Sequence, residues 1–168
     1  YMDYLDHTHR PIFKIVIPSL NRPEELCLTT LALLRSHRIS LSNAGVLITP
    51  AELPAHDAPE WSRYFAAFGR HDRMEVELLP GAKGLEQQMR KAMEWVGQGY
   101  MITMSDTVTD ILVRHTRRRS GRQFLAPIKK GCLLPFIHHA RDLMIAGTFT
   151  AWSVNPMHNA GRMSSKNM

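Results

Sequence analysis

Cysteine is scarce in this chain, and long apolar runs are missing. Only two of its 168 residues are cysteines, Cys27 and Cys132, and they lack the C-x-x-C spacing of zinc or redox sites. We expect both thiols in the core of an intracellular domain, in preference to a disulfide. No apolar run approaches the roughly eighteen residues that a membrane-spanning helix needs, so no membrane partner is expected.

Motifs of several enzyme classes are also missing. The chain has no G-x-x-x-x-G-K-[ST] loop, no H-E-x-x-H and no G-x-S-x-G, which argues against P-loop hydrolases, zincins and α/β-hydrolases. Its nine histidines include the adjacent pair His138 and His139, which are poorly placed to share a metal on one helix face. The first residues carry no secretory signal pattern, and we expect an intracellular location, cytoplasmic or nuclear.

Acidic residues are outnumbered by basic ones. The chain holds 15 Asp and Glu against 21 Lys and Arg, a formal net charge of +6, which favours partners such as nucleic acid or nucleotide phosphates. Nucleic-acid contact is possible through five arginines and through Lys129-Lys130; the arginines are Arg114, Arg117, Arg118, Arg119 and Arg122. Because no aromatic residue interrupts the arginine run and no helical period orders it, we favour a mobile, solvated loop there.

The pattern of apolar residues predicts an α/β fold. A length of 168 residues favours one domain, residues 1–168, with an ordinary 44% hydrophobic content. Apolar runs predict strands at 12–17, 45–49, 75–79 and 100–104, the third of them near an edge. Helices are predicted at 23–35, at 61–68 and from residue 85 to the stop at Gly97. This alternation predicts a mostly parallel sheet with helices on both faces.

Residues at helical spacing should face the core. For the first helix they are Leu26, Thr30, Leu31 and Leu34, for the second Trp61, Tyr64, Phe65 and Phe68, and for the third Leu85, Met89, Ala92, Met93 and Val96. Beyond residue 110 the pattern is weaker. It suggests strands at 124–128 and 148–154 and a helix at 133–145.

The apolar strand predicted at 100–104 ends just before the polar residue Asp106. Strands of open α/β sheets often deliver a polar side chain to the crevice beyond their carboxyl ends, where ligands bind. Asp106 could therefore hold a divalent cation and, through it, a diphosphate; the alternative is an aspartate that caps a turn or helix. The turn Gly81-Ala-Lys83-Gly84 precedes a helix, and its backbone N-H groups and Lys83 could bind a phosphate. The alternative is an ordinary glycine turn with a solvated lysine.

The order of these segments resembles that of GT-A glycosyltransferases. Ile15-Val-Ile-Pro-Ser-Leu-Asn-Arg-Pro23 is similar to the opening strand and loop of that family, an apolar strand followed by Pro-(Ser/Thr)-x-Asn-Arg. Gly84-Leu with its helix, and then Gly99-Tyr-Met-Ile-Thr-Met-Ser-Asp-Thr107, look like the helix and strand that lead to the D-x-D motif. The chain looks most like the TET/JBP-associated glycosyltransferase group, which includes phage DNA-base modifiers and a vertebrate estrogen-induced growth regulator. The segment Trp152-Ser-Val-Asn-Pro156 is similar to a late strand and turn of that group.

The resemblance covers residues 12–110 well and 147–159 loosely, and it implies a fold and an activity. The fold would be a Rossmann-like GT-A sandwich, incomplete at its C-terminus, with residues 12–110 as the nucleotide-sugar-binding half and 111–168 as a partial acceptor-side half. The activity would be transfer of a sugar from a nucleotide-sugar, with UDP-sugars expected, to a macromolecular acceptor, either a protein or a modified nucleic-acid base. The resemblance identifies no catalytic base.

The resemblance also points to site residues. Together with the glycine turn, the expected nucleotide-binding set is Pro18, Ser19, Asn21, Arg22, Glu52, Lys83, Gly84 and Arg90. Asp106 would be the central carboxylate of a site for manganese or magnesium, but Ser105 and Thr107 stand where family members carry aspartates. Asp110 could add a carboxylate only if the intervening segment is helical. Two alternatives therefore stay open: a catalytically degenerate binding module, and a basic nucleic-acid-binding domain.

Overall fold

The computed structural model describes residues 13–49, 59–69, 75–116 and 121–148, without the side chains of Pro59, Glu60 and Arg114. The chain divides into two compact units, residues 1–109 and 110–168, here called the N-terminal and C-terminal units. Their boundary lies one residue from the expected division between two halves of a single domain. That the two halves form one domain stays a prediction.

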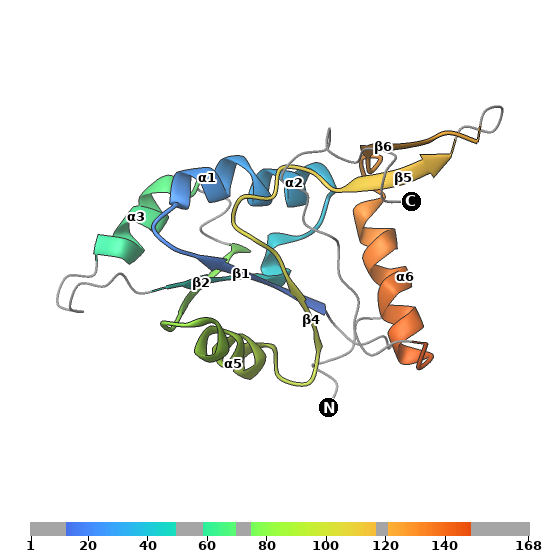
Figure 1. Cartoon of the computed structure of the whole chain (residues 1–168). Helices are drawn as coiled ribbons and strands as arrows, with labels where there is room; N and C mark the ends of the chain where they lie inside the picture. Colours follow the sequence, from blue (N-terminus) through green and yellow to red (C-terminus); the bar gives the residue numbers. More distant parts are fainter. Residues whose placement is uncertain (1–12, 50–58, 70–74, 117–120, 149–168) are drawn as a thin grey trace. The chain divides into compact units, whose positions relative to one another are not determined.

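A four-stranded parallel sheet forms the centre of the N-terminal unit (Figure 1). Its strands, in the spatial order β3-β2-β1-β4, are β1 (Phe13–Ser19), β2 (Ala44–Ile48), β3 (Glu77–Pro80) and β4 (Tyr100–Thr103). Every residue of β2 is buried, as expected for a central parallel strand that is covered on both faces. The prediction of an α/β fold with a parallel sheet is confirmed, and so is the edge position of β3.

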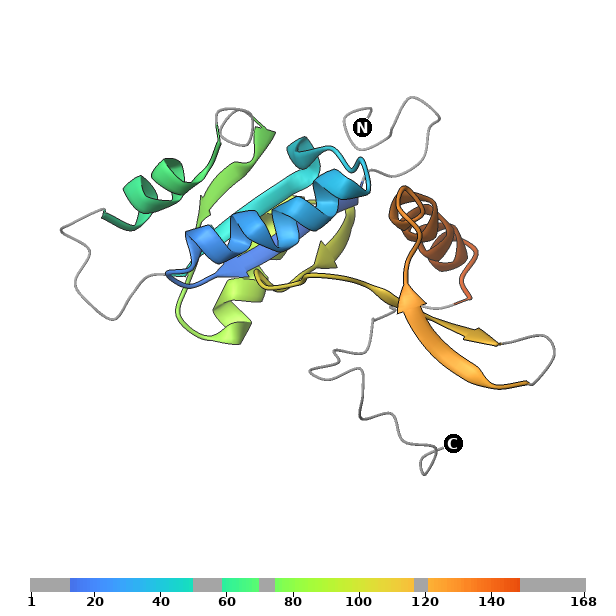
Figure 2. The same ribbon diagram turned by 90° about the horizontal axis from the view of Figure 1, so that it is seen from above.

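Helices cover both faces of this sheet. The helices α1 (Pro23–Leu28) and α2 (Thr30–Ser36) lie over one face and α5 (Leu85–Val96) lies under the other (Figures 1 and 2). A 3-10 helix, η2 (Leu41–Asn43), leads into β2. The chain runs outward from β1 to β3 and then returns through α5 to the free side of β1. Right-handed crossovers in opposite directions place their helices on opposite faces, which explains the two layers.

The helix that the sequence predicts at 23–35 is broken in two at Thr29, whose φ of −111° and ψ of −90° are not helical. Threonine hydroxyls compete with the helical hydrogen-bond ladder, and Thr29 Oγ1 lies 2.6 Å from the carbonyl oxygen of Glu25. The predicted inner face is nevertheless confirmed on both sides of the break: Leu26, Thr30, Leu31 and Leu34 are all buried.

The prediction for the inner face of α5 is wrong at two positions. Leu85 and Met93 are exposed, and the buried stripe consists of Gln88, Ala92 and Val96. Ala92 and Val96 pack against Val16 of β1 and Leu47 of β2, with Trp95 and Met101 at the margin. The buried face of α5 is rotated relative to the predicted one, because it includes the hydrogen-bonded side chain of Gln88. A pattern of hydrophobic residues cannot reveal a buried polar residue.

The helix α3 (Pro59–Ala67) contributes an aromatic pair to the core. Tyr64 and Phe68 are buried and meet edge to face, with ring centroids 6.2 Å apart. Trp61 is half-buried. The expectation of a core position is wrong for Phe65, which is exposed because its place on the helix is one residue beyond the face that carries Tyr64.

In its described residues, 110–116 and 121–148, the C-terminal unit forms a β-hairpin and a helix. The strands β5 (Leu112–Thr116) and β6 (Gln123–Pro127) pair antiparallel, and α6 (Leu133–Ile145) has the predicted bounds. The expected solvated loop is wrong for Arg114, which lies on β5 opposite Leu125. This pairing is not local, so the composition of the run could not indicate it. Arg117, Arg118, Arg119 and the segment 149–154 of the last predicted strand lie outside the described residues.

The two cysteines do not share a core. Cys27 is half-buried, but Cys132 is exposed just before α6, so its predicted core position is wrong. Apolar neighbours in sequence had suggested burial, whereas Cys132 precedes the helix whose buried face begins at Leu133. Among the helices that the structure describes, none has the length and apolar character needed to cross a bilayer.

Candidate functional site

The point where the strand order reverses lies between β1 and β4. Both strands run in the same direction, with Val16 opposite Thr103, so their carboxyl ends meet at one edge of the sheet. Ser19 is the last residue of β1, and Asp106 follows β4 by three residues. Open α/β sheets bind their ligands in the crevice at such a reversal. The fold thus brings Ser19 and Asp106 to the edge where a ligand is expected.

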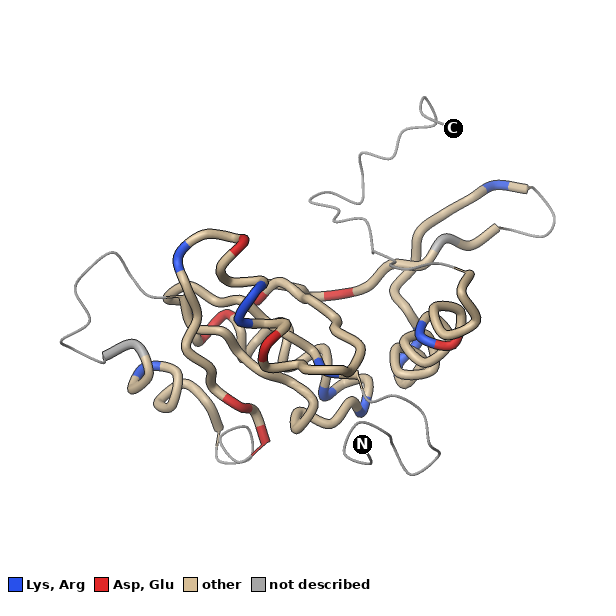
Figure 3. Tube along the Cα trace, turned by 90° about the horizontal axis from the view of Figure 1, so that it is seen from below, with Lys and Arg blue, Asp and Glu red and all other residues tan. Residues whose placement is uncertain are grey.

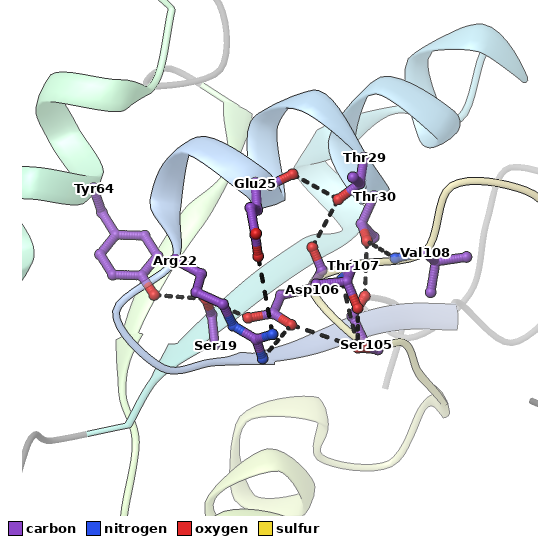
Figure 4. Close-up of polar contacts among 10 residues, drawn as sticks. All are labelled: Ser19, Arg22, Glu25, Thr29, Thr30, Tyr64, Ser105, Asp106, Thr107 and Val108. Atoms are coloured by element: carbon purple, nitrogen blue, oxygen red, sulfur yellow. Dashed lines mark hydrogen bonds and ion pairs between the residues drawn. The ribbon is translucent and has the colours of Figure 1, made fainter. Parts of the chain in front are cut away.

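Asp106 is buried there, with 2% of its surface exposed, and its carboxylate is fully engaged (Figure 4). Ser19 Oγ donates a hydrogen bond to Oδ2 at 3.0 Å. Arg22 Nη2 lies 3.0 Å from Oδ1 in an ion pair, and Ser105 Oγ lies 3.5 Å from the same oxygen. A buried carboxylate is tolerated only when such partners replace its lost hydration. Asp106 is therefore not a simple turn-capping aspartate.

A second buried hydroxyl continues this chain of hydrogen bonds. Tyr64 Oη of α3 lies 2.5 Å from Ser19 Oγ (Figure 4). The Ser19 hydroxyl has one proton, and an ionised carboxylate can only accept, so Ser19 donates to Asp106. Tyr64 must then donate to Ser19. All the protons in the series Tyr64, Ser19, Asp106 point toward the carboxylate, which stabilises its negative charge.

The break between α1 and α2 serves the turn that carries Asp106. Thr30 Oγ1 donates to the carbonyl oxygen of Ser105 at 2.7 Å and accepts from the backbone N-H of Val108 at 3.0 Å. Thr29 Oγ1 lies 2.8 Å from the carbonyl oxygen of Asp106 as well as 2.6 Å from that of Glu25, and its single proton serves one of them at a time. The two threonines fix the backbone of this turn against the helix.

Arg22 connects the buried carboxylate to solvent. Its side chain is 49% exposed, and its Nη1 lies 3.9 Å from Oε2 of Glu25. Guanidinium groups present several donors in one plane and suit phosphate oxygens. Arg22 can therefore neutralise Asp106 and still present donors to an anionic ligand at the edge.

The loop that carries Arg22 has a defined shape. Asn21 adopts a left-handed backbone conformation with φ of 55°, which asparagine tolerates better than most residues. Its Oδ1 accepts a hydrogen bond from Arg63 Nη1 of α3. Pro18, half-buried on β1 opposite Leu47, precedes the loop. Of the expected residues, Ser19 and Arg22 contact Asp106, whereas Pro18 and Asn21 belong to the same segment without a described contact to it.

The glycine turn before α5 uses much of its hydrogen-bonding capacity internally. The N-H of Gly81 donates to the carbonyl oxygen of Ile48 at 2.9 Å, and the N-H of Ala82 donates to Gln88 Oε1. The Gln88 amide also donates to the Leu47 carbonyl oxygen at 3.3 Å and to Thr49 Oγ1 at 3.2 Å. Two of the N-H groups that the sequence offered to a phosphate are therefore satisfied within the protein.

Three expected nucleotide-binding residues lie on this turn or on α5. Lys83 and Gly84 are exposed at the start of the helix, and Gly84 has a φ of 84°. Arg90 is exposed on α5, where its Nη2 lies 3.6 Å from Oε1 of Glu86. Their described contacts are local to the α5 side of the sheet, opposite the helices that hold Asp106. Glu52 lies outside the described residues.

The metal site implied by the resemblance is reduced to one carboxylate. The segment from Thr107 to Asp110 is not helical, so the condition for Asp110 to join Asp106 is not met. Asp110 is exposed, and its Oδ1 accepts from the backbone N-H of Ile111 at 2.8 Å. Across the described ranges, no three His, Cys, Asp or Glu side chains gather as metal ligands. The side chains on the Asp106 carboxylate are the Arg22 guanidinium and the hydroxyls of Ser19 and Ser105, and Thr107 Oγ1 lies 3.1 Å from Ser105 Oγ.

Sequence reasoning did not assign Tyr64, Thr29 and Thr30 to the candidate site, where they form hydrogen bonds. Tyr64 looked like one more core aromatic, and the threonine pair looked like part of one helix. The only local signal was the pair of β-branched hydroxyl residues in the middle of a predicted helix. Comparisons with protein-family models, curated proteins and solved structures find no match for this chain, so what the site can do follows from its own residues.

Proposed function

We propose that the N-terminal unit is a GT-A type glycosyltransferase domain that binds a nucleotide-sugar, with UDP-sugars expected, and transfers the sugar to a macromolecular acceptor. The observation that carries the proposal is the meeting of Ser19, Arg22 and Asp106 at the reversal of the strand order, 3-2-1-4. The sheet order and the two helical layers agree with a Rossmann-like half of such a domain. The Pro18 to Arg22 loop and the strand before Asp106 are the two segments that resemble the family in sequence.

Arg22 is the residue that we expect to contact the diphosphate. Its charge is held by Asp106 at 3.0 Å while its other nitrogen faces Glu25 and solvent. A diphosphate oxygen would be a strong partner for the same planar donors. Positive charge at this position stabilises the negative charge that develops on the departing nucleoside diphosphate.

Asp106 is the residue that would hold a cation. A site with one carboxylate suits magnesium or manganese only when waters and substrate phosphates complete the ligand set. The hydroxyls of Ser19, Ser105 and Thr107 fit that chemistry as hard oxygen donors, although they are weaker than carboxylates. When bound there, the ion would supply additional stabilisation of the diphosphate leaving group.

The second candidate is a binding module that holds the nucleotide without transferring the sugar. It is favoured by the neutral residues Ser105 and Thr107 beside Asp106, and by the engagement of both carboxylate oxygens with protein groups. A module of this kind binds nucleotide but produces no free UDP and no glycosylated product. A third candidate, nucleic-acid binding, concerns the C-terminal unit.

Binding of UDP and UDP-sugars, measured by calorimetry with and without manganese, tests the proposal. Asp106→Asn keeps the shape of the side chain but removes its charge, whereas Asp110→Asn makes the same change at an exposed carboxylate. We expect manganese to strengthen UDP binding to the parent chain, and we expect Asp106→Asn to lose roughly tenfold or more of this enhancement, by analogy with removing a supporting group from a metal site. Asp110→Asn should behave as the parent.

Three results would separate the candidates. Absence of any UDP binding, with or without manganese, rejects the donor site. Equal loss in Asp106→Asn and Asp110→Asn rejects the role of Asp106. Binding without release of UDP from UDP-sugars, across a panel of acceptors, favours the silent module over the transferase.

A further inference from the structure

The net positive charge of this protein lies in the C-terminal unit. Residues 110–168 contain ten Lys and Arg against two Asp, a formal net charge of +8. Residues 1–109 contain eleven Lys and Arg against thirteen Asp and Glu, a formal net charge of −2. These values together give the +6 of the whole chain. An acidic partner is therefore attracted to the C-terminal unit, and Figure 3 marks the charged positions along the described trace.

Strand pairing in this unit places aromatic rings among the basic residues. His115 of β5 lies opposite Phe124 of β6, and the two rings stack with centroids 5.4 Å apart and planes 25° apart. Phe124 is 41% exposed. Val113, two residues before His115 and thus on the same face of the strand, is exposed as well. One face of the hairpin therefore presents stacked rings and an apolar side chain to solvent.

Basic side chains lie at both ends of this face. Arg122 is exposed immediately before β6, and Lys129 and Lys130 are exposed after it. At about 3.4 Å per residue, the seven residue steps between Arg122 and Lys129 set them roughly 24 Å apart. The ladder between the strands extends to Ile128, whose N-H donates to the carbonyl oxygen of Ile111 at 2.7 Å, so the spacing is held by the hairpin.

We propose that the β5–β6 hairpin binds single-stranded nucleic acid. An unpaired base stacks on the pair formed by Phe124 and His115, and the flanking phosphates are contacted by Arg122 at one end and by Lys129 and Lys130 at the other. Aromatic platforms with adjacent positive charge are the common means of binding single strands. The bases of a duplex are already stacked on one another, so an exposed apolar ring gains little from them. This inference does not depend on nucleotide-sugar binding.

The pairing of β5 and β6 supplies the aromatic ring that the sequence of the arginine run did not show. The arginine run contains no Phe, Tyr or Trp, but Phe124 on the opposite strand stacks on His115 within the run, so a ring pair lies among the charges in space. Exposed apolar rings also distinguish this surface from a merely charged loop, which would attract any polyanion.

Fluorescence anisotropy of the whole chain with a labelled single-stranded DNA of mixed sequence tests the proposal. The matching duplex and polyglutamate serve as competitors. We expect Phe124→Ala to weaken binding about tenfold or more, as removal of a stacking ring does in other single-strand binders. Phe124→Tyr should retain affinity, because it keeps the ring. Phe136→Ala is the matched control, since Phe136 of α6 is 39% exposed in the same unit.

Salt dependence tests the phosphate contacts separately. The combined change Lys129→Gln and Lys130→Gln should lower the slope of log affinity against log salt by roughly 0.7 for each lysine. If circular dichroism shows that Phe124→Ala unfolds the chain, His115→Ala removes the other ring of the pair in its place.

Four outcomes would overturn the proposal. They are no binding by the parent chain, equally tight binding of the duplex, equally strong competition by polyglutamate at the same charge concentration, and equal losses in Phe124→Ala and Phe136→Ala. The proposal is supported if the chain prefers single-stranded DNA and if Phe124→Ala loses affinity while Phe136→Ala does not.

Discussion

At the scale of single residues, the candidate site is a carboxylate that is stabilised by directed hydrogen bonds. The Asp106 carboxylate accepts a hydrogen bond from Ser19 Oγ at 3.0 Å and pairs with Arg22 Nη2 at 3.0 Å. Ser19 Oγ in turn accepts a hydrogen bond from Tyr64 Oη at 2.5 Å. Tyr64 is buried and contacts Ser19, and by donating to Ser19 it supports the hydrogen bond that Ser19 donates to Asp106. It is a positioning residue for Asp106.

Removing the two hydroxyls of this series should reveal their coupling. Tyr64→Phe and Ser19→Ala should each lower the free energy of unfolding by about 1–2 kcal/mol, because each removes a buried hydrogen bond. The double variant should lose less than the sum of the two, since the hydrogen bond between the two hydroxyls can be lost only once. Urea unfolding of the four proteins measures this.

Strictly additive losses would contradict the hydrogen bond between Tyr64 and Ser19. The parallel cycle of Ser40→Ala and Ser42→Ala, an exposed hydroxyl pair 2.8 Å apart, is the matched control. Its coupling should be within error of zero, because water replaces an exposed hydrogen bond at little cost.

At the scale of elements, two backbone irregularities shape the edge of the sheet. The break at Thr29 turns the hydroxyls of Thr29 and Thr30 toward the turn of Asp106. At Gly81 the backbone before α5 lies close to the last residue of β2. An added Cβ at Gly81 would lie 2.6 Å from the carbonyl oxygen of Ile48 and 2.8 Å from Gln88 Oε1.

Gly81→Ala should therefore be destabilising. The close neighbours include backbone and a hydrogen-bonded amide, which cannot move aside freely, so we expect a loss of about 1–3 kcal/mol, the usual cost of overpacking. Thermal unfolding compared with Gly69→Ala measures it, because a Cβ at Gly69 has no heavy atom within 4 Å.

Gly69→Ala should change stability little or raise it slightly by restricting the unfolded chain. A Gly81→Ala variant as stable as Gly69→Ala would show that the turn relaxes, and that the path of the backbone over β2 is not constrained.

At the scale of the whole molecule, the chain divides into two units that differ in formal net charge. The N-terminal unit is nearly neutral and holds the buried carboxylate, whereas the C-terminal unit carries the net positive charge and the exposed rings. The division at residues 109 and 110 falls in a segment without helix or strand, between β4 and β5.

Brief digestion with a protease that cleaves before aspartate tests this boundary. Asp110 is exposed, whereas Asp106 is buried and hydrogen-bonded, so we expect cleavage before Asp110 to precede cleavage before Asp106. Mass spectrometry of the early fragments identifies the order. Earlier cleavage before Asp106 would mean that the turn opens more readily than the boundary, which is incompatible with a well-held site.

The sequence by itself determined the elements of this protein. The apolar runs of β1 and β2, the stop at Gly97 and the bounds of α6 are all local signals, because hydrophobic period and capping residues act over a few neighbours. The same local reasoning placed Asp106 beyond the end of a strand, whereas Ser19 and Arg22 entered the expected site through the resemblance. It misplaced Leu85, Met93, Phe65 and Cys132, whose burial depends on which side of an element finds a partner.

Only the tertiary structure decided how distant residues meet. Ser19 and Asp106 are 87 residues apart, and Tyr64 and Ser19 are 45 apart. Neither contact has a local signature, since it depends on strand order and on where α3 packs. The same holds for Phe124 beside His115 and for the buried amide of Gln88. Local pattern selects helix or strand, but the order of strands determines which polar groups share a site.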